Sequence, residues 1–300
     1  MKVFLTGGTG FVGRAVVAEL LRRNHEPLIL ARPGSESKLG SIGADTERIR
    51  IIPGDVLKPE TYAAALKEAE AVIHLIGILR EFGRVRFDLM HRVATENIVR
   101  ESELAGVKRY VHMSACGVGR LSKSVGLKTK LAGEKAVRAS RLNWTIFRPS
   151  VIFGPGDGFA HFFMRRFRRL PMAPLISGGR TLFQPIAIED VARVFVDAAE
   201  RQDLGGKTFE IGGRGIFSFK QILDDIGTAM EKRILKVPAP RFLLAMMALF
   251  LDRFRFFPIS RDQLRMLASD NCCDSLAYIE IFGIEPRDFR EGLRALAKET

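Results

Sequence analysis

The chain of 300 residues has 47% hydrophobic and 27% charged residues, a balance typical of globular proteins that excludes a disordered chain. Its formal net charge of +13 is compatible with binding to nucleic acid, with binding to an acidic membrane surface, or with a role in solubility alone. Binding to nucleic acid is the least favoured, because no DNA- or RNA-binding motif accompanies the charge. The three cysteines, Cys116, Cys272 and Cys273, lack metal-ligand spacing. This spacing predicts no metal site. The apolar start is too short for a signal peptide, so we expect a cytoplasmic protein with free thiols.

The chain opens with a strand that runs into a glycine-rich turn. Residues 3–5 are apolar, Gly7, Gly10 and Gly13 follow at GxxGxxG spacing, and residues 11–23 have helical apolar spacing. In this context the glycines permit a tight turn, close approach to a pyrophosphate and close helix packing, and the helix N-terminus attracts phosphates. An ordinary strand–helix turn is the alternative. The motif predicts a dinucleotide site formed by Gly7, Thr9, Gly10, Phe11, Val12 and Gly13.

Strand-like and helix-like segments alternate after this turn. Strands are expected at 27–31, 49–53, 71–75, 109–113, 144–147 and 207–211, and helices at 87–104 and 128–140. Alternation of this kind predicts an α/β fold with a Rossmann-type doubly wound parallel sheet and helices on both faces.

The pattern changes after Pro149. We expect residues 1–150 to form an NAD(P)-binding Rossmann domain whose core is completed by 185–211, while 151–184 and 212–300 form a small lobe for substrate or partner. Two segments of this lobe, 162–169 and 241–257, are rich in arginine and apolar residues. They predict contact with a membrane surface or a respiratory-complex partner at the inner face of the membrane, although 242–257 is also compatible with a helix packed on its own domain.

The end of the second predicted strand indicates which nucleotide is bound. Ala31 and Arg32 stand there, with no acidic residue to bind a ribose 2′-hydroxyl. Arg32 can pair with a 2′-phosphate through charge-assisted hydrogen bonds, and Ser35 and Lys38 are near in sequence. The pattern favours NADP(H) over NAD(H), the alternative being a solvated surface arginine.

Two further segments fit the adenine side of a dinucleotide. Asp55 and Val56 follow the third strand, where a carboxylate can accept from the adenine amino group. Capping of the next helix by Asp55 is an equal alternative. Leu75, Ile76 and Gly77 follow the fourth strand, where the backbone can pass beside the ribose.

These segments together resemble the atypical short-chain dehydrogenase/reductases of extended type, within the NAD-dependent epimerase/dehydratase superfamily. The matching segments are 6–13, 54–56, 148–157 and 184–192. Through 128–138, 260–264 and 270–271 the chain is also similar to bacterial relatives of the nucleotide-binding accessory subunit of mitochondrial respiratory complex I.

The resemblance implies a catalytic serine and a Tyr-x-x-x-Lys motif, in which the tyrosine relays a proton to the substrate oxygen. Lys130 matches the lysine, but Gly126 stands at the tyrosine position and Ala115 at the serine position, with Ser114 one residue early. Tyr62, Tyr110 and Tyr278 are the only tyrosines, and none lies in the expected helix. We therefore assign no catalytic residue.

The resemblance still implies that Lys130 holds the nicotinamide ribose, the alternative being a solvent-facing lysine on a helix. Ser114, Pro149, Ser150 and Val151 are candidates for the nicotinamide end. His74 and His112 are expected in the core. His161, with Phe153, is a candidate for the wall of the nicotinamide pocket and for a substitute acid.

Two functions from different classes remain. The first is an NADP(H)-binding structural or redox-sensing protein linked to respiratory-chain or quinone metabolism. The second is an NAD(P)-dependent oxidoreductase or epimerase/dehydratase that uses a substitute acid. A transcriptional regulator that senses NADP(H) fits the charge but has no DNA-reading element.

Overall fold

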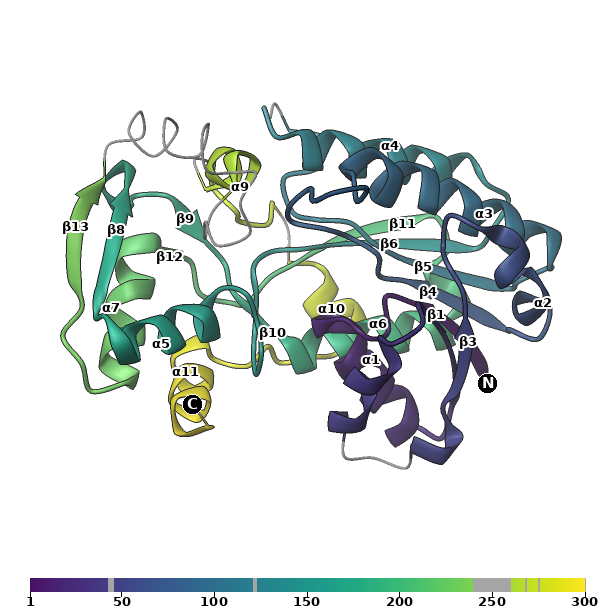
Figure 1. Ribbon diagram of the computed structural model, residues 1–300, viewed down its shortest axis with the longest axis horizontal. Helices are drawn as coiled ribbons and strands as arrows, with labels where there is room; N and C mark the ends of the chain where they lie inside the picture. Colours follow the sequence, from purple (N-terminus) through teal and green to yellow (C-terminus); the bar gives the residue numbers. More distant parts are fainter. Residues whose placement is uncertain (43–45, 121–122, 240–259, 268, 275, 300) are drawn as a thin grey trace.

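The computed structural model describes residues 1–42, 46–120, 123–239, 260–267, 269–274 and 276–299. At its centre lies a seven-stranded sheet in the order β11-β6-β5-β4-β1-β2-β3, in which every neighbouring pair is parallel (Figure 1). Its strands are β1 (Lys2–Thr6), β2 (Glu26–Ala31), β3 (Arg50–Pro53), β4 (Ala71–His74), β5 (Arg109–Met113), β6 (Trp144–Pro149) and β11 (Lys207–Ile211). The predicted Rossmann-type doubly wound α/β fold is confirmed.

Helices cover both faces of this sheet. They are α1 (Phe11–Arg22), α2 (Ala63–Leu66), α3 (Ala94–Leu104), α4 (Val125–Ala139) and α6 (Ile188–Glu200). Leu5 packs with Val16 of α1 and Phe195 of α6 in one core, whereas Phe4 packs with Ile98 of α3 in the other. Successive side chains of a strand point to opposite faces, so β1 is buried on both sides, as its apolar run predicts.

The segment predicted as one helix over 87–104 is helical throughout and contains a π segment, Leu89–Val93, before α3. The other predicted helix differs at its start. The helix expected from 128 begins at Val125, because the Ser124 hydroxyl caps it by accepting from Leu127 N–H at 3.1 Å. Short 3-10 segments occupy Glu36–Ile42, Thr46–Arg48, Pro59–Thr61, Ser177–Gly179 and Gln202–Leu204.

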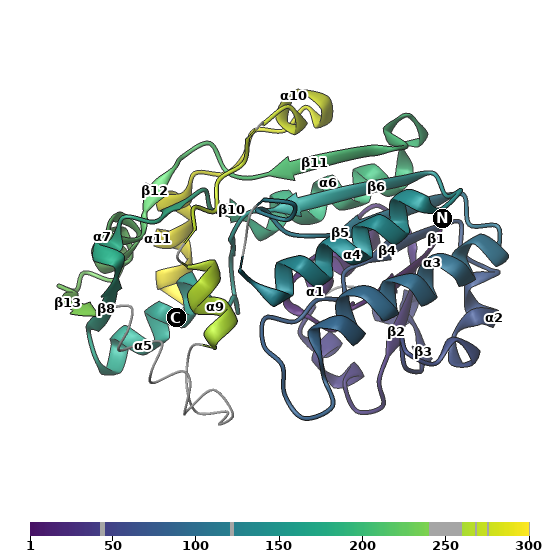
Figure 2. The same cartoon turned by 90° about the horizontal axis from the view of Figure 1, so that it is seen from above.

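A smaller group of elements lies beside the sheet (Figures 1 and 2). Its helices are α5 (Ala160–Arg169), α7 (Phe219–Ala229), α9 (Arg261–Met266), α10 (Tyr278–Phe282) and α11 (Phe289–Glu299). Its strands pair as β7 (Ile152–Phe153) with β10 (Ile186–Ala187), β8 (Met172–Ile176) with β13 (Leu235–Ala239) and β9 (Leu182–Phe183) with β12 (Phe217–Ser218). Phe167, Phe183 and Phe219 share a third apolar core there, which α10 does not join because Tyr278 and Phe282 pack on the sheet side.

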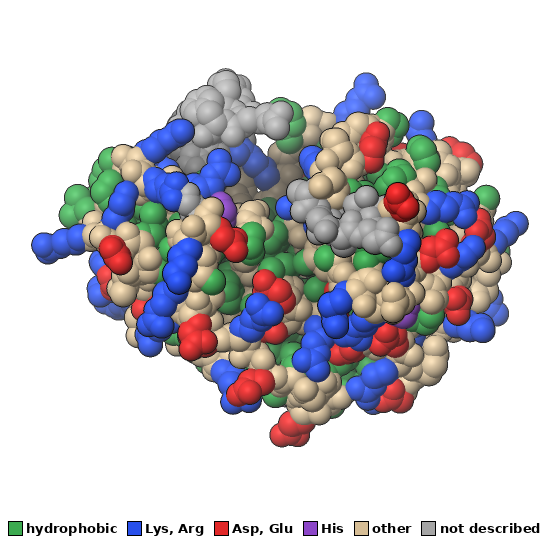
Figure 3. Space-filling view, turned by 90° about the horizontal axis from the view of Figure 1, so that it is seen from below, with side chains coloured by type: hydrophobic (Ala, Val, Ile, Leu, Met, Phe, Trp, Pro, Cys, Tyr) green, Lys and Arg blue, Asp and Glu red, His purple; other side chains and the backbone are tan. Residues whose placement is uncertain are grey.

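The basic residues of α5 are exposed, while Met164 and Phe167 of the same helix are buried. Figure 3 shows Lys and Arg side chains spread over one face of the molecule and interleaved with Asp and Glu. Within the described ranges, no helix is both long and apolar enough to cross a bilayer. The second basic and apolar segment predicted for partner contact, 241–257, lies outside the described residues.

Candidate functional site

The glycine turn after β1 adopts a conformation that only glycines allow. Gly7 has a φ of +75°, and its carbonyl accepts from Gly10 N–H at 2.9 Å. A Cβ added at Gly13 would lie 2.1 Å from Gly7 O, so α1 packs directly on the turn. Gly10 precedes α1 without a side-chain cap. The first N–H groups of α1 are therefore available to an anionic ligand.

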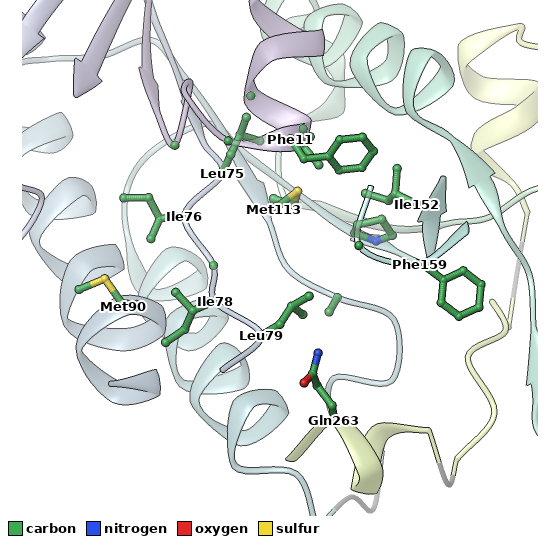
Figure 4. A pocket seen from close by; sticks show the side chains of 18 of the residues that line it. Phe11, Leu75, Ile76, Ile78, Leu79, Met90, Met113, Ile152, Phe159 and Gln263 are labelled. Carbon is green, nitrogen blue, oxygen red and sulfur yellow. The ribbon is translucent and has the colours of Figure 1, made fainter. Parts of the chain in front are cut away.

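A cavity of about 1260 Å³ opens beside this turn, between the carboxyl ends of the strands and the smaller group of elements. Its volume exceeds the usual range for a single small ligand, so it can hold an extended dinucleotide with space remaining. The structure gathers every residue predicted for coenzyme binding around this one cavity: Gly7, Thr9, Gly10, Phe11, Val12, Gly13, Arg32, Asp55, Val56, Leu75, Ile76, Gly77, Ser114, Lys130, Pro149, Ser150 and Val151. Figure 4 shows Phe11 and Gln263 on opposite sides of it.

At the β2 end of the cavity Arg32 is exposed and lines the wall together with Ser35 and Lys38. Asp55 also lines the wall, and its Oδ1 accepts from Leu57 N–H at 3.0 Å. One carboxylate oxygen of Asp55 therefore stabilises the local turn, whereas the helix cap considered as the alternative is not observed, because Pro59–Thr61 begins without a side-chain cap. Oδ2 can still accept a hydrogen bond from a ligand.

Lys130 lies at the other end, where its Nζ donates to Met113 O at 3.0 Å. A Cβ added at Gly77 would lie 3.1 Å from Lys130 Nζ, so the glycine leaves space for the ammonium group. Burial lowers the pKa of Lys130 to about 8. His91, which the sequence left without a role, supports this wall: its Nε2 accepts from Ile78 N–H at 3.0 Å, and its Nδ1 lies 2.9 Å from Thr129 Oγ1. Burial lowers the pKa of His91 to about 3, so it is neutral.

The lowered pKa of Lys130 predicts a pH dependence of stability. Between the folded value of about 8 and the ordinary value of 10.5, the unfolded chain holds more protons than the folded one, so the folded state gains stability as pH rises. Relative to Lys130→Met, we expect the free energy of unfolding of the wild type to increase by about 2 kcal/mol between about pH 7 and about pH 10. Urea unfolding at a series of pH values measures this difference, and parallel curves for the two proteins would contradict it.

The N-terminus of α4, where the resemblance places a relay tyrosine, is contacted by another part of the chain. Asp262 of α9 accepts hydrogen bonds from Ser124 Oγ at 2.6 Å, Val125 N–H at 2.7 Å and Gly126 N–H at 3.1 Å. A Cβ added at Gly126 would lie 3.0 Å from Asp262 Oδ2. Asp262 thus caps α4 and complements the partial positive charge of its N-terminus.

We therefore expect that a tyrosine introduced at position 126 will not create a proton relay. We expect Gly126→Tyr to lower stability by about 1–3 kcal/mol, because the new side chain must displace the Asp262 carboxylate or the Phe87 ring, whose Cε1 lies 3.3 Å from the new Cβ. NADPH oxidation should not increase. Val125→Tyr is the matched control, since Val125 is the preceding residue and is 45% exposed. Thermal unfolding and an NADPH oxidation assay check both points, and turnover gained by Gly126→Tyr would refute the interpretation.

Asn271 is a further cavity residue whose role the sequence did not reveal. Its Oδ1 accepts from Ser150 Oγ and from Val151 N–H, both at 2.8 Å, and it lines the cavity. Its partners are more than a hundred positions away, so the segment 270–271 resembles the family without showing this role. His161 and Phe153, expected at the nicotinamide pocket, do not line this cavity; His161 Nδ1 instead accepts from Gly156 N–H at 3.3 Å.

The cavity continues away from the coenzyme-side residues into an apolar arm. We define this arm by the lining residues of α5, β8, β9, α7 and α9 and of the position after α9: Phe162, Phe163, Arg166, Phe167, Met172, Pro174, Phe183, Phe219, Gln263, Leu264, Met266 and Leu267. All but Arg166 and Gln263 are apolar. Such a lining favours a hydrocarbon group over a polar one, because burial of apolar surface drives binding.

Comparison with known proteins gives a family and several relatives. Residues 7–202 match a family model described as NAD(P)H-binding. The chain is 30% identical over 242 residues to the mitochondrial NADH dehydrogenase [ubiquinone] 1 alpha subcomplex subunit 9 of Arabidopsis thaliana, covering 78% of this chain and 60% of that protein. It is 27% identical over 245 residues to a ceramide reductase of Caulobacter vibrioides, covering 81% and 75%.

Solved structures resemble the whole chain in fold. The UDP-glucose 4-epimerase of Thermus thermophilus, solved as a complex with NAD, has a TM-score of 0.75 and 18% sequence identity and covers 99% of this chain and 98% of its own. This likeness concerns the fold alone, and it agrees with the epimerase/dehydratase-like, extended short-chain dehydrogenase/reductase architecture expected from the sequence.

Proposed function

Because the chain belongs to the NAD(P)H-binding family that matches residues 7–202, we propose that it binds NADP(H) in preference to NAD(H) as a structural or redox-sensing protein without a tyrosine relay. The observation that carries this proposal is the Asp262 carboxylate, which accepts from Gly126 N–H at 3.1 Å and lies 3.0 Å from the place of a Cβ at position 126. The residues around the cavity suit the coenzyme: the glycine turn and the start of α1 for the diphosphate, Arg32 for the 2′-phosphate and Lys130 for the nicotinamide ribose.

Bound NADPH would supply a hydride. His91, near Lys130, offers little proton transfer in return, because it is neutral and both of its ring nitrogens lie within hydrogen-bond distance of protein groups. Ser150 Oγ donates within the protein, to Asn271. This arrangement favours holding the coenzyme over turning it over.

A setting in the respiratory chain or in quinone metabolism is part of the proposal. It is supported by the relatives named as subunit 9 of an NADH dehydrogenase [ubiquinone] subcomplex. The exposed arginines of α5, together with Phe162, which is 40% exposed, offer a basic and apolar face to a membrane surface or to a respiratory complex.

Calorimetry and an activity screen test the proposal together. Purified protein titrated with NADPH and NADH should bind NADPH more tightly. Incubation of the protein with NADPH and a panel of quinones, aldehydes and nucleotide sugars should leave the coenzyme unoxidised. Clear turnover of any of these compounds would reject a purely binding role, and equal affinities would reject the preference for NADP(H).

The apolar arm favours a second candidate, an NAD(P)-dependent oxidoreductase that reduces a carbonyl compound with a long hydrocarbon chain. The relative named as a ceramide reductase supports it. Positioning and hydride transfer contribute to rate without a relay tyrosine, and solvent or a substitute acid would supply the proton. Stopped-flow oxidation of bound NADPH by decanal, compared with acetaldehyde, tests this candidate. No chain-length-dependent loss of nicotinamide absorbance would count against it.

A further inference from the structure

Two cysteines that the sequence treats as independent free thiols meet in the fold. The sulfur atoms of Cys116 and Cys273 and a carboxylate oxygen of Glu210 all lie within 4.8 Å of one another. Cys116 follows β5 and is 1% exposed, whereas Cys273 is partly buried on the segment 270–274, which we call the strap. The two thiols are separated by more than 150 positions, so only the tertiary structure brings them together.

Each residue of the strap forms a hydrogen bond with another part of the fold. Its hydrogen bonds are Leu182 N–H to Asp270 Oδ1 at 2.8 Å, Ser150 Oγ to Asn271 Oδ1 at 2.8 Å, Arg120 Nη2 to Cys272 O at 2.9 Å, Cys273 N–H to Gln184 Oε1 at 2.9 Å and Asp274 N–H to Glu210 Oε2 at 2.7 Å. These bonds fix Cys273 beside Cys116 and place Asn271 at the cavity wall.

A metal ion fits this cluster poorly. Glu210 is already engaged by Arg120 at 3.3 Å and by the Asp274 N–H. The Arg120 guanidinium also pairs with Asp274 at 2.8 Å. A metal ion would have to displace these protein partners before it could take the Glu210 carboxylate as a ligand.

We propose that Cys116 and Cys273 form a reversible disulfide that fastens the strap to the loop after β5 when a peroxide is present. The Cys116 thiolate attacks one oxygen of hydrogen peroxide and releases hydroxide, which gives a sulfenic acid. The sulfur of Cys273 then attacks the sulfenic sulfur, and water leaves. In sum, two thiols and one peroxide give one disulfide and two waters. The hydrogen bond from Cys273 lowers the pKa of the Cys116 thiol, which agrees with Cys116 as the attacking group.

The disulfide closes a loop of more than 150 residues and links the loop after β5 to the strap, whose Asn271 lines the cavity. We expect it to slow local opening of the strap, because a cross-link removes open conformations. Cys272 offers a matched control: it neighbours Cys273 and is partly buried, its carbonyl accepts from the Cys116 thiol at 3.2 Å, and its sulfur does not belong to the cluster of Cys116, Glu210 and Cys273.

Peroxide treatment of the full chain, followed by thiol blocking and mass spectrometry of tryptic peptides, tests the proposal. In the wild type, free thiols should fall from three to one, with the Cys116 peptide joined to the strap peptide. The cross-link should survive Cys272→Ser, disappear in Cys273→Ser and Cys116→Ser, and reverse with dithiothreitol. In the Cys272→Ser variant, oxidation that forms the cross-link should slow hydrogen exchange of the strap amides about tenfold relative to the reduced protein. A cross-link lost in Cys272→Ser, no cross-link in folded wild type, or a tightly bound zinc ion on the thiols would overturn the proposal.

Discussion

Gly13→Ala is expected to reduce NADPH affinity by at least about 100-fold, a change of roughly 3 kcal/mol. The added methyl carbon would lie 2.1 Å from Gly7 O and 2.6 Å from Gly8 Cα, and both are backbone atoms that cannot rotate away. The turn and the start of α1 must therefore move apart. Since the same turn is proposed to receive the diphosphate, the N–H groups of α1 would no longer converge on it.

Calorimetry with NADPH measures this loss, and circular dichroism checks that the variant is folded. Gly40→Ala is the control, because a Cβ at Gly40 meets no atom within 4 Å and the residue is exposed. Gly10→Ala gives an intermediate case: its Cβ would contact only Gly7 O, at 3.1 Å. If the Gly13→Ala protein is folded and binds NADPH with the affinity of the wild type, the glycine turn is not part of the coenzyme site.

Arg32→Glu should lower NADPH affinity by about 10- to 100-fold, the loss of one charge-assisted hydrogen-bonded pair, and leave NADH affinity nearly unchanged. Arg32 is exposed at the cavity wall, so a guanidinium there can reach a 2′-phosphate without a change in the core. The new carboxylate would repel the phosphate, whereas NADH has only a hydroxyl at this place. The preference between the two coenzymes should therefore disappear or reverse.

Arg233→Glu is the matched control, because Arg233 is also exposed, lies outside the cavity lining, and undergoes the same change of charge. This control distinguishes a direct pair between Arg32 and the 2′-phosphate from the general attraction of a phosphate to a chain with a net charge of +13. Titrations of both variants with both coenzymes at two salt concentrations measure the effect. Equal losses of NADPH and NADH affinity in Arg32→Glu would show that Arg32 does not select the coenzyme.

The residues predicted for coenzyme binding lie around one cavity, and this grouping could be predicted from the sequence because each of its parts is local. Gly7, Gly10 and Gly13 act within one turn and one helix, and the strand order of this fold brings Arg32, Asp55 and Leu75 to the same edge of the sheet. The candidate substrate side was predicted less well. His161 and Phe153 lie away from the cavity, whereas Asn271 and Gln263 line it.

The sequence by itself determined the alternating α/β pattern, the glycine turn and the absence of a tyrosine at position 126, since these depend on residue type and short-range spacing. Only the tertiary structure decided which side chain contacts Gly126 and where the thiols lie. Asp262 reaches Gly126 across 136 positions, and Cys273 reaches Cys116 across the sheet edge. Such contacts arise from the packing of whole elements, and no local pattern in the chain encodes which distant side chain will fill a given space.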